Sequence, residues 1–337
     1  MIVERILIVG LGSIGMRHLN IAKKLFPFAK IAVLRHQKYV EKPEHTDFQF
    51  SEMNEALSFS PQIAVICNPA PFHIHIAQEL AENGAHLFIE KPISNKSQGV
   101  DRLIKICEQH RLILHVGYNL RYFKSLQYFR SSLQNKIIGE IFSVRSEVGQ
   151  YLPLWRKNKD YRDGVSAKRN LGGGVLLELS HEIDYLRWVF GDIYWVQAIL
   201  AKQSNLEVDV EDTAHIIFGF NASNRNKQLI ASVNLDFIRH DTTRLCRAIG
   251  ETGTLEWNCI NDSVSIYKPK QNKWEILFAC KNKSNDSYLE EWKGFIKALN
   301  GNKENIVDGE DGLKTLYVAE AARLSSQNNG IKTLIKI

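Results

Sequence analysis

The chain has 337 residues, of which 44% are hydrophobic and 24% charged, and its formal net charge is +6. This length exceeds the size at which one hydrophobic core keeps growing, so we expect two domains, and the composition excludes disorder as the main state. The basic residues form no long run, which argues against nucleic acid as a partner and leaves anionic small molecules compatible.

The five cysteines lie far apart and form no Cys-x-x-Cys pair, as expected for reduced thiols in a reducing compartment. The apolar run near the N-terminus is too short for a signal peptide. No segment approaches the roughly 18 apolar residues of a membrane span. We therefore expect a cytoplasmic protein with no membrane partner and no bound metal.

The first third of the chain alternates short apolar runs with segments of helical periodicity. The runs are 5–10, 30–35, 63–67, 86–89 and 112–116, and the helical segments include 14–25, 72–83 and 97–109. Such alternation predicts a parallel sheet with crossover helices. We expect a doubly wound α/β domain over residues 1–120.

A glycine pattern follows the first apolar run directly. Gly10 would make the turn, Gly12 would let backbone approach a pyrophosphate, and Gly15 would permit close packing of the helix. Together with Ser13 and Ile14 these glycines predict a dinucleotide site, because the amides of a helix N-terminus face phosphates well. The first domain is therefore expected to have a Rossmann fold.

The end of the second apolar run indicates which dinucleotide binds. A protein that reads the ribose 2′-hydroxyl usually has Asp or Glu there, whereas this sequence has Arg35 and His36. An acidic side chain would repel a 2′-phosphate, while Arg35 can grip one. We predict NADP(H) as the preferred cofactor. The alternative is that Arg35 is only a solvated strand-end residue and that the site also accepts NAD(H).

Beyond about residue 120 the rhythm changes to apolar runs separated by turn-like residues. The runs lie near 139–150, 193–201, 208–220, 228–238, 244–250, 253–260 and 274–279, with helical periodicity at 122–134, 181–190, 287–299 and 310–326. This pattern predicts an α+β domain over residues 121–337 with a large, mainly antiparallel open sheet backed by helices. We expect its open face to form a homodimer or homotetramer.

Two further motifs follow the third and fourth runs. They are Asn68-Pro69-Ala70-Pro71-Phe72-His73 and Glu90-Lys91-Pro92. With the glycine pattern they resemble the Gfo/Idh/MocA family of glucose–fructose oxidoreductase, inositol dehydrogenase and rhizopine catabolism proteins. The likeness continues through Gly117-Tyr118-Asn119-Leu120-Arg121-Tyr122, Gly172-Gly173-Gly174 and His181-Glu182-Ile183-Asp184.

The resemblance implies a Rossmann domain joined to an α/β domain with a large, mainly antiparallel sheet. It also implies that Lys91, His181 and Asp184 face the nicotinamide ring and a sugar-like substrate. The Lys-Pro peptide bond is often cis in relatives. The other implied contacts are Asn68, Pro69, His73 and Glu90 with the cofactor, and Tyr118, Asn119 and Arg121 with the substrate.

These residue types suit hydride transfer between a carbon–oxygen centre and nicotinamide. Lys91 can stabilise developing alkoxide charge and His181 can exchange the proton, and which of them is the formal base stays open. Asp184, three residues after His181 on an expected helix, can bond the substrate or hold the imidazole tautomer. Relatives usually carry Asp four residues before the histidine. Glu178 precedes it by three, so we expect Glu178 to contact substrate or orient His181.

A basic and aromatic segment precedes the triple glycine. Its residues are Tyr151, Trp155, Arg156, Lys157, Lys159, Tyr161, Arg162, Lys168 and Arg169. Aromatic platforms with Arg forks suit a sugar bearing phosphate, carboxylate or nucleotide, so Trp155, Arg156 and Arg162 are candidate substrate contacts. The alternative is an ordinary charged loop.

We therefore expect an NAD(P)-dependent oxidoreductase acting on a hydroxyl or carbonyl carbon of a sugar, sugar derivative or nucleotide sugar. One alternative is a redox-neutral enzyme that performs elimination or glycoside hydrolysis through transient oxidation by a retained nicotinamide. The other is a non-catalytic NADP(H)-binding regulator, suggested only by the shift of Glu178.

Overall fold

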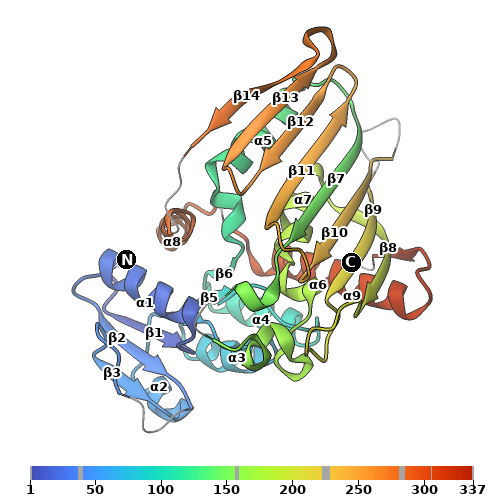
Figure 1. Cartoon of the computed structure of the whole chain (residues 1–337). Coiled ribbons are helices and arrows are strands. Elements are labelled where there is room, and N and C mark those ends of the chain that lie inside the picture. Colours follow the sequence, from blue (N-terminus) through green and yellow to red (C-terminus); the bar gives the residue numbers. More distant parts are fainter. Residues whose placement is uncertain are drawn as a thin grey trace. The chain divides into compact units, whose positions relative to one another are not determined.

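The computed structural model describes residues 2–36, 41–155, 159–221, 228–280, 285–304 and 306–335. They form two compact units, whose elements are labelled in Figure 1. The first unit comprises Met1–Tyr118 and Asn285–Leu316, and the second comprises Asn119–Ser284 and Tyr317–Ile337. The sequence predicts a boundary between two domains at residue 120, and this boundary stays a prediction.

The first unit is built on a six-stranded parallel sheet in the order β3-β2-β1-β4-β5-β6. The strands are β1 (Arg5–Val9), β2 (Lys30–Leu34), β3 (Phe48–Phe50), β4 (Ile63–Ile66), β5 (His86–Glu90) and β6 (Leu114–Gly117). The strand order reverses direction between β1 and β4, so a crevice is expected at their carboxyl ends. The predicted doubly wound Rossmann sheet is confirmed.

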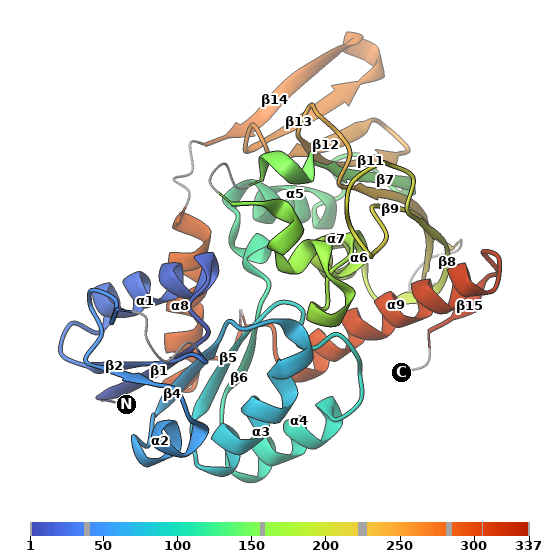
Figure 2. The ribbon, with the colours of Figure 1, turned by 60° about the horizontal axis from the view of Figure 1, so that its bottom comes forward.

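Helices cover both faces of this sheet, as Figure 2 shows with α3 and α4 on one face and α1 and α8 on the other. The helices are α1 (Ser13–Leu25), α2 (Met53–Ser58), α3 (His73–Glu82), α4 (Val100–Gln109) and α8 (Asp286–Leu299). A 3-10 turn, η1 (Ala70–Phe72), precedes α3, and helix α9 (Gly309–Gln327) begins in this unit and ends in the second. Strands buried on both faces explain the continuous apolar runs of the sequence.

Helix α8 corrects one expectation. The sequence placed an amphipathic helix at 287–299 with the second sheet, but Trp292, Phe295 and Ala298 are buried in the core of the first unit. They pack there with Leu19 and Ala22 of α1. Periodicity identifies the apolar face of a helix without identifying the sheet that this face covers.

The second unit contains a nine-stranded sheet in the order β14-β13-β12-β11-β7-β10-β9-β8-β15. The strands are β7 (Ile141–Gly149), β8 (Ile193–Ala201), β9 (Thr213–Phe220), β10 (Ile230–Asp236), β11 (Thr243–Gly250), β12 (Thr254–Asn258), β13 (Ser263–Lys268), β14 (Lys273–Ala279) and β15 (Thr333–Leu334). Strands β7 and β10 pair in parallel, and the other neighbours pair antiparallel. The predicted mainly antiparallel sheet is confirmed.

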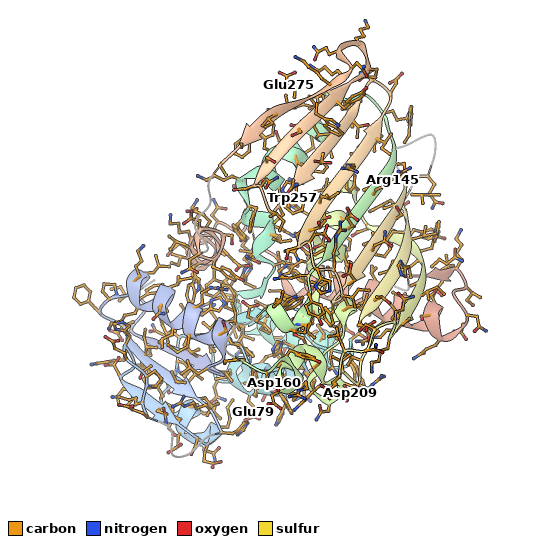
Figure 3. The ribbon with its side chains drawn as sticks, in the orientation of Figure 1. Glu79, Arg145, Asp160, Asp209, Trp257 and Glu275 are labelled. Atoms are coloured by element: carbon orange, nitrogen blue, oxygen red, sulfur yellow. The ribbon has the colours of Figure 1, made fainter. Side chains whose placement is uncertain are left out.

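Helices cover one face of the nine-stranded sheet (Figure 1). They are α5 (Lys124–Gln134), α6 (Val175–Glu178), α7 (His181–Phe190) and the end of α9, and short 3-10 turns connect them. Trp257 of β12 is buried and donates to Ser125 of α5 at 2.9 Å, whereas Arg145 of β7 is exposed. Figure 3 labels both residues. No helix among the described residues is long and apolar enough to cross a membrane.

Candidate functional site

The glycine turn after β1 fits a dinucleotide pyrophosphate. Gly10 has a φ of 82°, a left-handed conformation that favours glycine, and an added Cβ would lie 2.8 Å from the backbone nitrogen of Asn68. A Cβ on Gly15 would lie 2.2 Å from the carbonyl oxygen of Gly10, so α1 packs closely on the turn. A Cβ on Gly12 would meet no atom within 4 Å, which leaves open space beside the helix N-terminus.

The first turn of α1 adds to this fit. It contains no acidic side chain, so its amides and the positive end of its dipole are not neutralised within the turn. Ser13 is exposed at this end, while Ile14 is half-buried against the core. Gly10 and Gly15 thus form the turn and the close helix packing that the sequence pattern predicts, and the approach of a pyrophosphate to Gly12 stays a prediction.

The predicted 2′-phosphate reader lies at the edge formed by β2 and β3. Arg35 follows β2 and donates from Nη2 to the carbonyl of Glu41 at 2.7 Å and to Oε1 of Gln49 at 2.9 Å. His36 is exposed beside it. A phosphate would share the Arg35 guanidinium with these two acceptors.

Two loops at the carboxyl edge of the first sheet are joined by His73. Its Nε2 lies 2.7 Å from the carbonyl oxygen of Asn68, after β4, and its Nδ1 lies 3.1 Å from that of Pro92, after β5. Burial lowers the pKa of His73, although both backbone carbonyls oppose that shift. Pro69 begins the connection between the first loop and α3. The structure therefore brings the two sequence motifs together.

Lys91 lies in the second of these loops. It is half-buried, and the Lys91–Pro92 peptide bond is cis. The preceding Glu90 turns inward, because its carboxylate accepts from the backbone N–H of Lys91 at 3.1 Å and lies 2.7 Å from Nε2 of His18. Sequence reasoning gave His18 no role. Its only signal was its position three residues after Gly15.

In the second unit, the triple glycine leads into the short helix α6 and then into α7. Gly174 has a φ of 105°, and a Cβ there would lie 2.3 Å from Oε1 of Glu211. The same oxygen accepts from the backbone of Leu176 at 3.3 Å. Glu211 was missed, since it lies 35 residues beyond Leu176 in sequence. Glu178 ends α6 and is half-buried, and His181 begins α7 and is 9% exposed.

Asp184 forms a two-point ion pair with Arg121. Nε of Arg121 donates to Oδ2 of Asp184 at 2.9 Å, and Nη2 donates to Oδ1 at 2.5 Å. The carboxylate is fully buried. The sequence left open whether Asp184 bonds a substrate or holds an imidazole. In the structure it fixes Arg121, which belongs to the 3-10 turn η2 (Asn119–Tyr122).

Two other polar residues of α7 anchor this helix to the sheet. Glu182 is fully buried and pairs with Arg244 of β11 at 2.9 Å. Burial raises the pKa of Glu182, although Arg244 opposes that shift. The hydroxyl of Tyr185 lies 2.6 Å from that of Ser146 on β7. His181 is therefore carried by a firmly held helix, a feature that the sequence motif did not reveal.

Arg162, a predicted anion contact, and Arg169 of the same segment both donate to acidic residues. Arg162 donates to Oδ1 of Asp160 at 2.9 Å, to Oδ2 of Asp160 at 2.6 Å and to Glu207 at 3.0 Å. The hydrogen bonds from Arg162 to Asp160 lower the pKa of that carboxyl to about 2. Arg169 donates to the carbonyl of Asp209 at 2.8 Å, and Figure 3 labels both aspartates. An anionic substrate would compete with these partners.

The remaining residues predicted to contact substrate lie in different surroundings. Trp155 donates to the carbonyl of Gln150 at 2.9 Å, a contact within the second unit, and Arg156 lies outside the described residues. Tyr118 and Asn119 are both buried, where the chain leaves the first unit and enters the second. Contact of Trp155, Tyr118 and Asn119 with substrate therefore stays a prediction.

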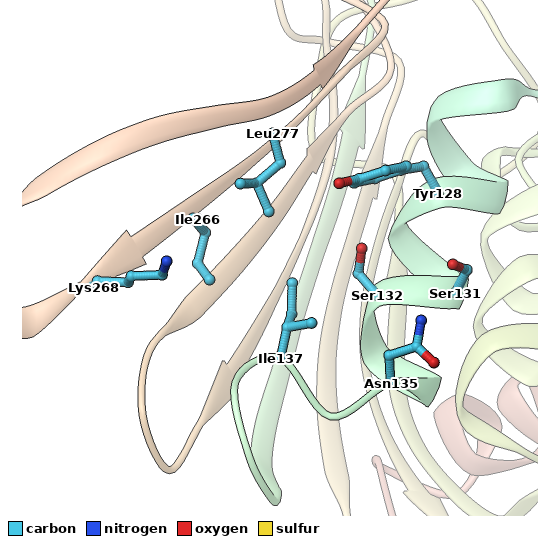
Figure 4. A pocket seen from close by; sticks show the side chains of 8 residues that line it. All are labelled: Tyr128, Ser131, Ser132, Asn135, Ile137, Ile266, Lys268 and Leu277. Atoms are coloured by element: carbon cyan, nitrogen blue, oxygen red, sulfur yellow. The ribbon is translucent and has the colours of Figure 1, made fainter.

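A hollow of about 330 Å³ lies elsewhere in the second unit, between α5 and strands β13 and β14 (Figure 4). It is lined by Tyr128, Ser131, Ser132, Asn135, Ile137, Ile266, Lys268 and Leu277. None of the predicted site residues is among these. Within the described residues, no three His, Cys, Asp or Glu side chains are grouped so that they could hold a metal.

Comparison with known families covers most of the chain. Residues 4–118 match the model described as the NAD-binding Rossmann fold of an oxidoreductase family, and residues 130–334 match the C-terminal alpha/beta domain of the same family, Gfo/Idh/MocA. Both halves of the chain therefore match one family.

Similar proteins include several enzymes that act on sugars or polyols. The chain is 25% identical to the myo-inositol 2-dehydrogenase of Thermotoga maritima, over 95% of this chain and 96% of that protein. It resembles the WlbA dehydrogenase of Bordetella pertussis, solved with NADH and UDP-GlcNAcA, with a TM-score of 0.80, 21% identity and 99% coverage of both chains. It is 24% identical to the 2,7-anhydro-N-acetylneuraminate hydratase of Mediterraneibacter gnavus over 55% of this chain and 48% of that protein.

Proposed function

The chain belongs to the Gfo/Idh/MocA oxidoreductase family and carries its NAD-binding Rossmann domain, and from this premise we propose that it is a dehydrogenase or reductase of a sugar or sugar derivative. The observation that carries the proposal is the open space beside Gly12 at the N-terminus of α1, together with Lys91 at the carboxyl end of strand β5 in the same sheet. Ligands of doubly wound sheets bind at that edge.

A bound nicotinamide would supply the acceptor or donor of the hydride. Gly10, Gly12, Ser13, Ile14 and Gly15 would hold the pyrophosphate through backbone amides. The proposal assigns the positive charge to Lys91, whose ammonium stabilises negative charge that develops on the substrate oxygen.

We assign the exchange of the proton on the substrate oxygen to His181, because imidazole exchanges protons near neutral pH. Its placement at the first residue of α7, on a helix held by Glu182 and Tyr185, supports a fixed orientation. Asp184 is given an indirect part, since it holds Arg121. Arg121 and the half-buried Glu178 are then the proposed substrate contacts in this part of the chain.

The proposed substrate class is a polyol, a sugar or a nucleotide-linked sugar. The names of the similar proteins support this class, because they include an inositol dehydrogenase and a complex with a UDP-linked sugar acid. An acidic or nucleotide-linked substrate would use the basic segment only if Arg162 exchanged its partners Asp160 and Glu207.

NADP(H) is proposed as the preferred cofactor and NAD(H) as the alternative, since the similar solved complex contains NADH. We expect Arg35→Ala to weaken NADPH binding about 10-fold, because it removes the cation that we assign to the 2′-phosphate, and to change NADH binding less than about 3-fold. Fluorescence titration with each cofactor measures both constants. Wild-type protein that binds NADH far more tightly than NADPH would overturn the preference.

The proposal is tested by a screen of polyols, sugars and nucleotide sugars that follows the absorbance of reduced nicotinamide. Turnover by wild type and its loss in Lys91→Ala are the expected results. Lys96→Ala is the matched control, since Lys96 lies in the same loop, is exposed and has no assigned role. Equal activity of wild type and Lys91→Ala would refute the assignment of Lys91.

The second candidate function is redox-neutral elimination or hydrolysis. The similarity to an anhydro-neuraminate hydratase favours it, although that match spans only 55% of this chain. An absorbance spectrum of the purified protein distinguishes the two. Tightly retained nicotinamide that returns to its starting state in every turnover would favour the second candidate.

The cytoplasmic location that the sequence predicts stays a prediction.

A further inference from the structure

A chain of hydrogen bonds inside the first unit ends on the backbone of Lys91. The indole Nε1 of Trp292 donates to Nδ1 of His18 at 2.8 Å, and Nε2 of His18 lies 2.7 Å from Oε1 of Glu90. The other carboxylate oxygen, Oε2, accepts the backbone N–H of Lys91 at 3.1 Å. Residues from α8, α1 and β5 are thereby joined in one line of donors and acceptors.

The direction of this chain follows from the chemistry of indole. An indole nitrogen carries a hydrogen and can only donate, so Nδ1 of His18 accepts and carries no proton. The proton of the neutral imidazole then sits on Nε2, which donates to Glu90. Trp292 thus selects the tautomer of His18 that can donate to the carboxylate.

The carboxylate of Glu90 has little room to move. Trp292 and His18 are fully buried, and Glu90 is 8% exposed. Phe88 packs edge-on against His18, with 4.9 Å between the ring centroids, and a Cβ on Gly117 would lie 3.2 Å from Cδ of Glu90. A buried carboxylate that loses a donor must shift or find another donor, and a shift moves the adjoining backbone.

We propose that His18 and Trp292 are positioning residues, which hold Glu90 and through it the backbone of Lys91 in the geometry that the reaction needs. This inference rests on the role of Lys91 in the proposed function. His18 lies on α1, whose first residues form the glycine turn, so the same chain ties that helix to the lysine loop. A displacement of about 1 Å at a reacting group costs on the order of 100-fold in rate.

Four variants separate positioning from packing. His18→Leu removes the donor, His18→Gln keeps one that can reach Glu90, and Trp292→Phe removes the indole N–H. Trp195→Phe is the matched control, because it removes an indole hydrogen bond, to Gln228 at 3.1 Å, from the second unit. The kcat, the KM and the cofactor Kd are measured at a temperature at which circular dichroism shows every variant folded.

We expect His18→Leu to lower kcat about 10- to 100-fold, with KM and cofactor Kd within about 3-fold of wild type. His18→Gln should recover most of that loss. Trp292→Phe should show a smaller loss in the same direction, and Trp195→Phe should have the wild-type kcat. Wild-type kcat in both His18→Leu and Trp292→Phe would overturn the inference, because the hydrogen bonds would then serve only the fold.

A second measurement does not depend on turnover. Nitrogen NMR of the wild type should show His18 protonated at Nε2 and unprotonated at Nδ1. The amide signal of Lys91 should shift in His18→Leu and Trp292→Phe but stay in place in Trp195→Phe. A protonated Nδ1 or an unmoved amide signal overturns the inference even where Lys91→Ala is inactive. A fully active Lys91→Ala instead overturns the role that the proposed function assigns to Lys91, and the NMR result still decides how His18 is held.

Discussion

Gly12 and Gly15 stand three residues apart in one pattern but meet different surroundings. A side chain on Gly15 would collide with the carbonyl oxygen of Gly10, whereas one on Gly12 would enter open space. The two glycines therefore separate the packing role of the turn from its binding role.

We expect Gly15→Ala to lower the free energy of unfolding by about 1–3 kcal/mol, because the turn must open to admit the methyl group. Gly12→Ala should cost less than about 1 kcal/mol, since it meets no neighbour, yet weaken NAD(P)H binding at least about 10-fold. Calorimetric melting and fluorescence titration measure the two effects. Wild-type cofactor affinity in Gly12→Ala would contradict the placement of the pyrophosphate.

Because of His73, we expect the stability of the folded protein to rise with pH near neutrality. Burial holds its pKa below the ordinary value of 6.5, so the unfolded chain takes up a proton at a higher pH than the folded protein does. The contribution of His73 to the free energy of unfolding is therefore fully present above pH 6.5. It decreases as the pH falls toward the lowered pKa. The stability advantage of wild type over His73→Gln should therefore shrink between about pH 8 and pH 5.

Chemical unfolding at a series of pH values measures this difference. His75→Gln is the matched control, since His75 lies on the same helix with a side chain that is 84% exposed. A difference between wild type and His73→Gln that stays constant with pH would show that His73 does not titrate in this window.

The sequence pattern predicted the glycine turn, and the family resemblance predicted the loop residues Asn68, Pro69 and Lys91, each of which follows an apolar run at the sheet edge. It could not identify Trp292 as the partner of His18, since 274 residues separate them. The pairing of Asp184 with Arg121 was also hidden, although both residues were predicted to belong to the site. The spacing of residues along the sequence indicates which of them share a face of a helix or strand. The partners of their side chains depend on how distant segments of the chain pack together.

Among the elements, the longer apolar runs and amphipathic helices were predicted, whereas several short elements were not. Strand β13 was missed although polar residues alternate with its two buried residues, Val264 and Ile266, as is typical of a strand with one buried face. The short elements β3 and α2 have little apolar pattern, since α2 buries only Ala56. Boundaries of the predicted helices differ from the structure by at most three residues, and those of the helix predicted at 181–190 agree with it.

Helix α8 provides a prediction at this scale. Phe295 is fully buried in the core of the first unit, so Phe295→Ala should lower the free energy of unfolding by about 3–5 kcal/mol. Phe28→Ala should change it by less than about 0.5 kcal/mol, because Phe28 is 96% exposed. Thermal melting measures both, and added NAD(P)H should restore part of the loss in Phe295→Ala by binding the folded unit. Equal stability of the two variants would contradict the placement of α8.

At the scale of the whole molecule, the nine-stranded sheet leaves apolar side chains exposed on the face opposite its helices. Ile199 is 48% exposed and Ile217 is 40% exposed, and they lie on the neighbouring strands β8 and β9. We proposed from the sequence that this face forms a homodimer or homotetramer, and exposed apolar groups of this kind support association.

Analytical ultracentrifugation tests that proposal. Wild type should sediment as a dimer or tetramer of 38.6 kDa chains. The double variant Ile199→Glu and Ile217→Glu should sediment as a smaller species while keeping its helical circular dichroism, because the charges face solvent in the single chain. Monomeric wild type at micromolar concentration would refute the proposed assembly.

The central claim is that Lys91 acts on the substrate oxygen while a nicotinamide dinucleotide is held at the glycine turn. Stopped-flow absorbance of reduced nicotinamide in a single turnover, with cofactor and substrate saturating, measures this most directly. We predict that Lys91→Ala slows the hydride step about 100- to 10,000-fold and leaves the cofactor Kd within about 3-fold of wild type. A hydride step of wild-type speed in Lys91→Ala, or a wild-type protein that binds neither NADH nor NADPH, would contradict it.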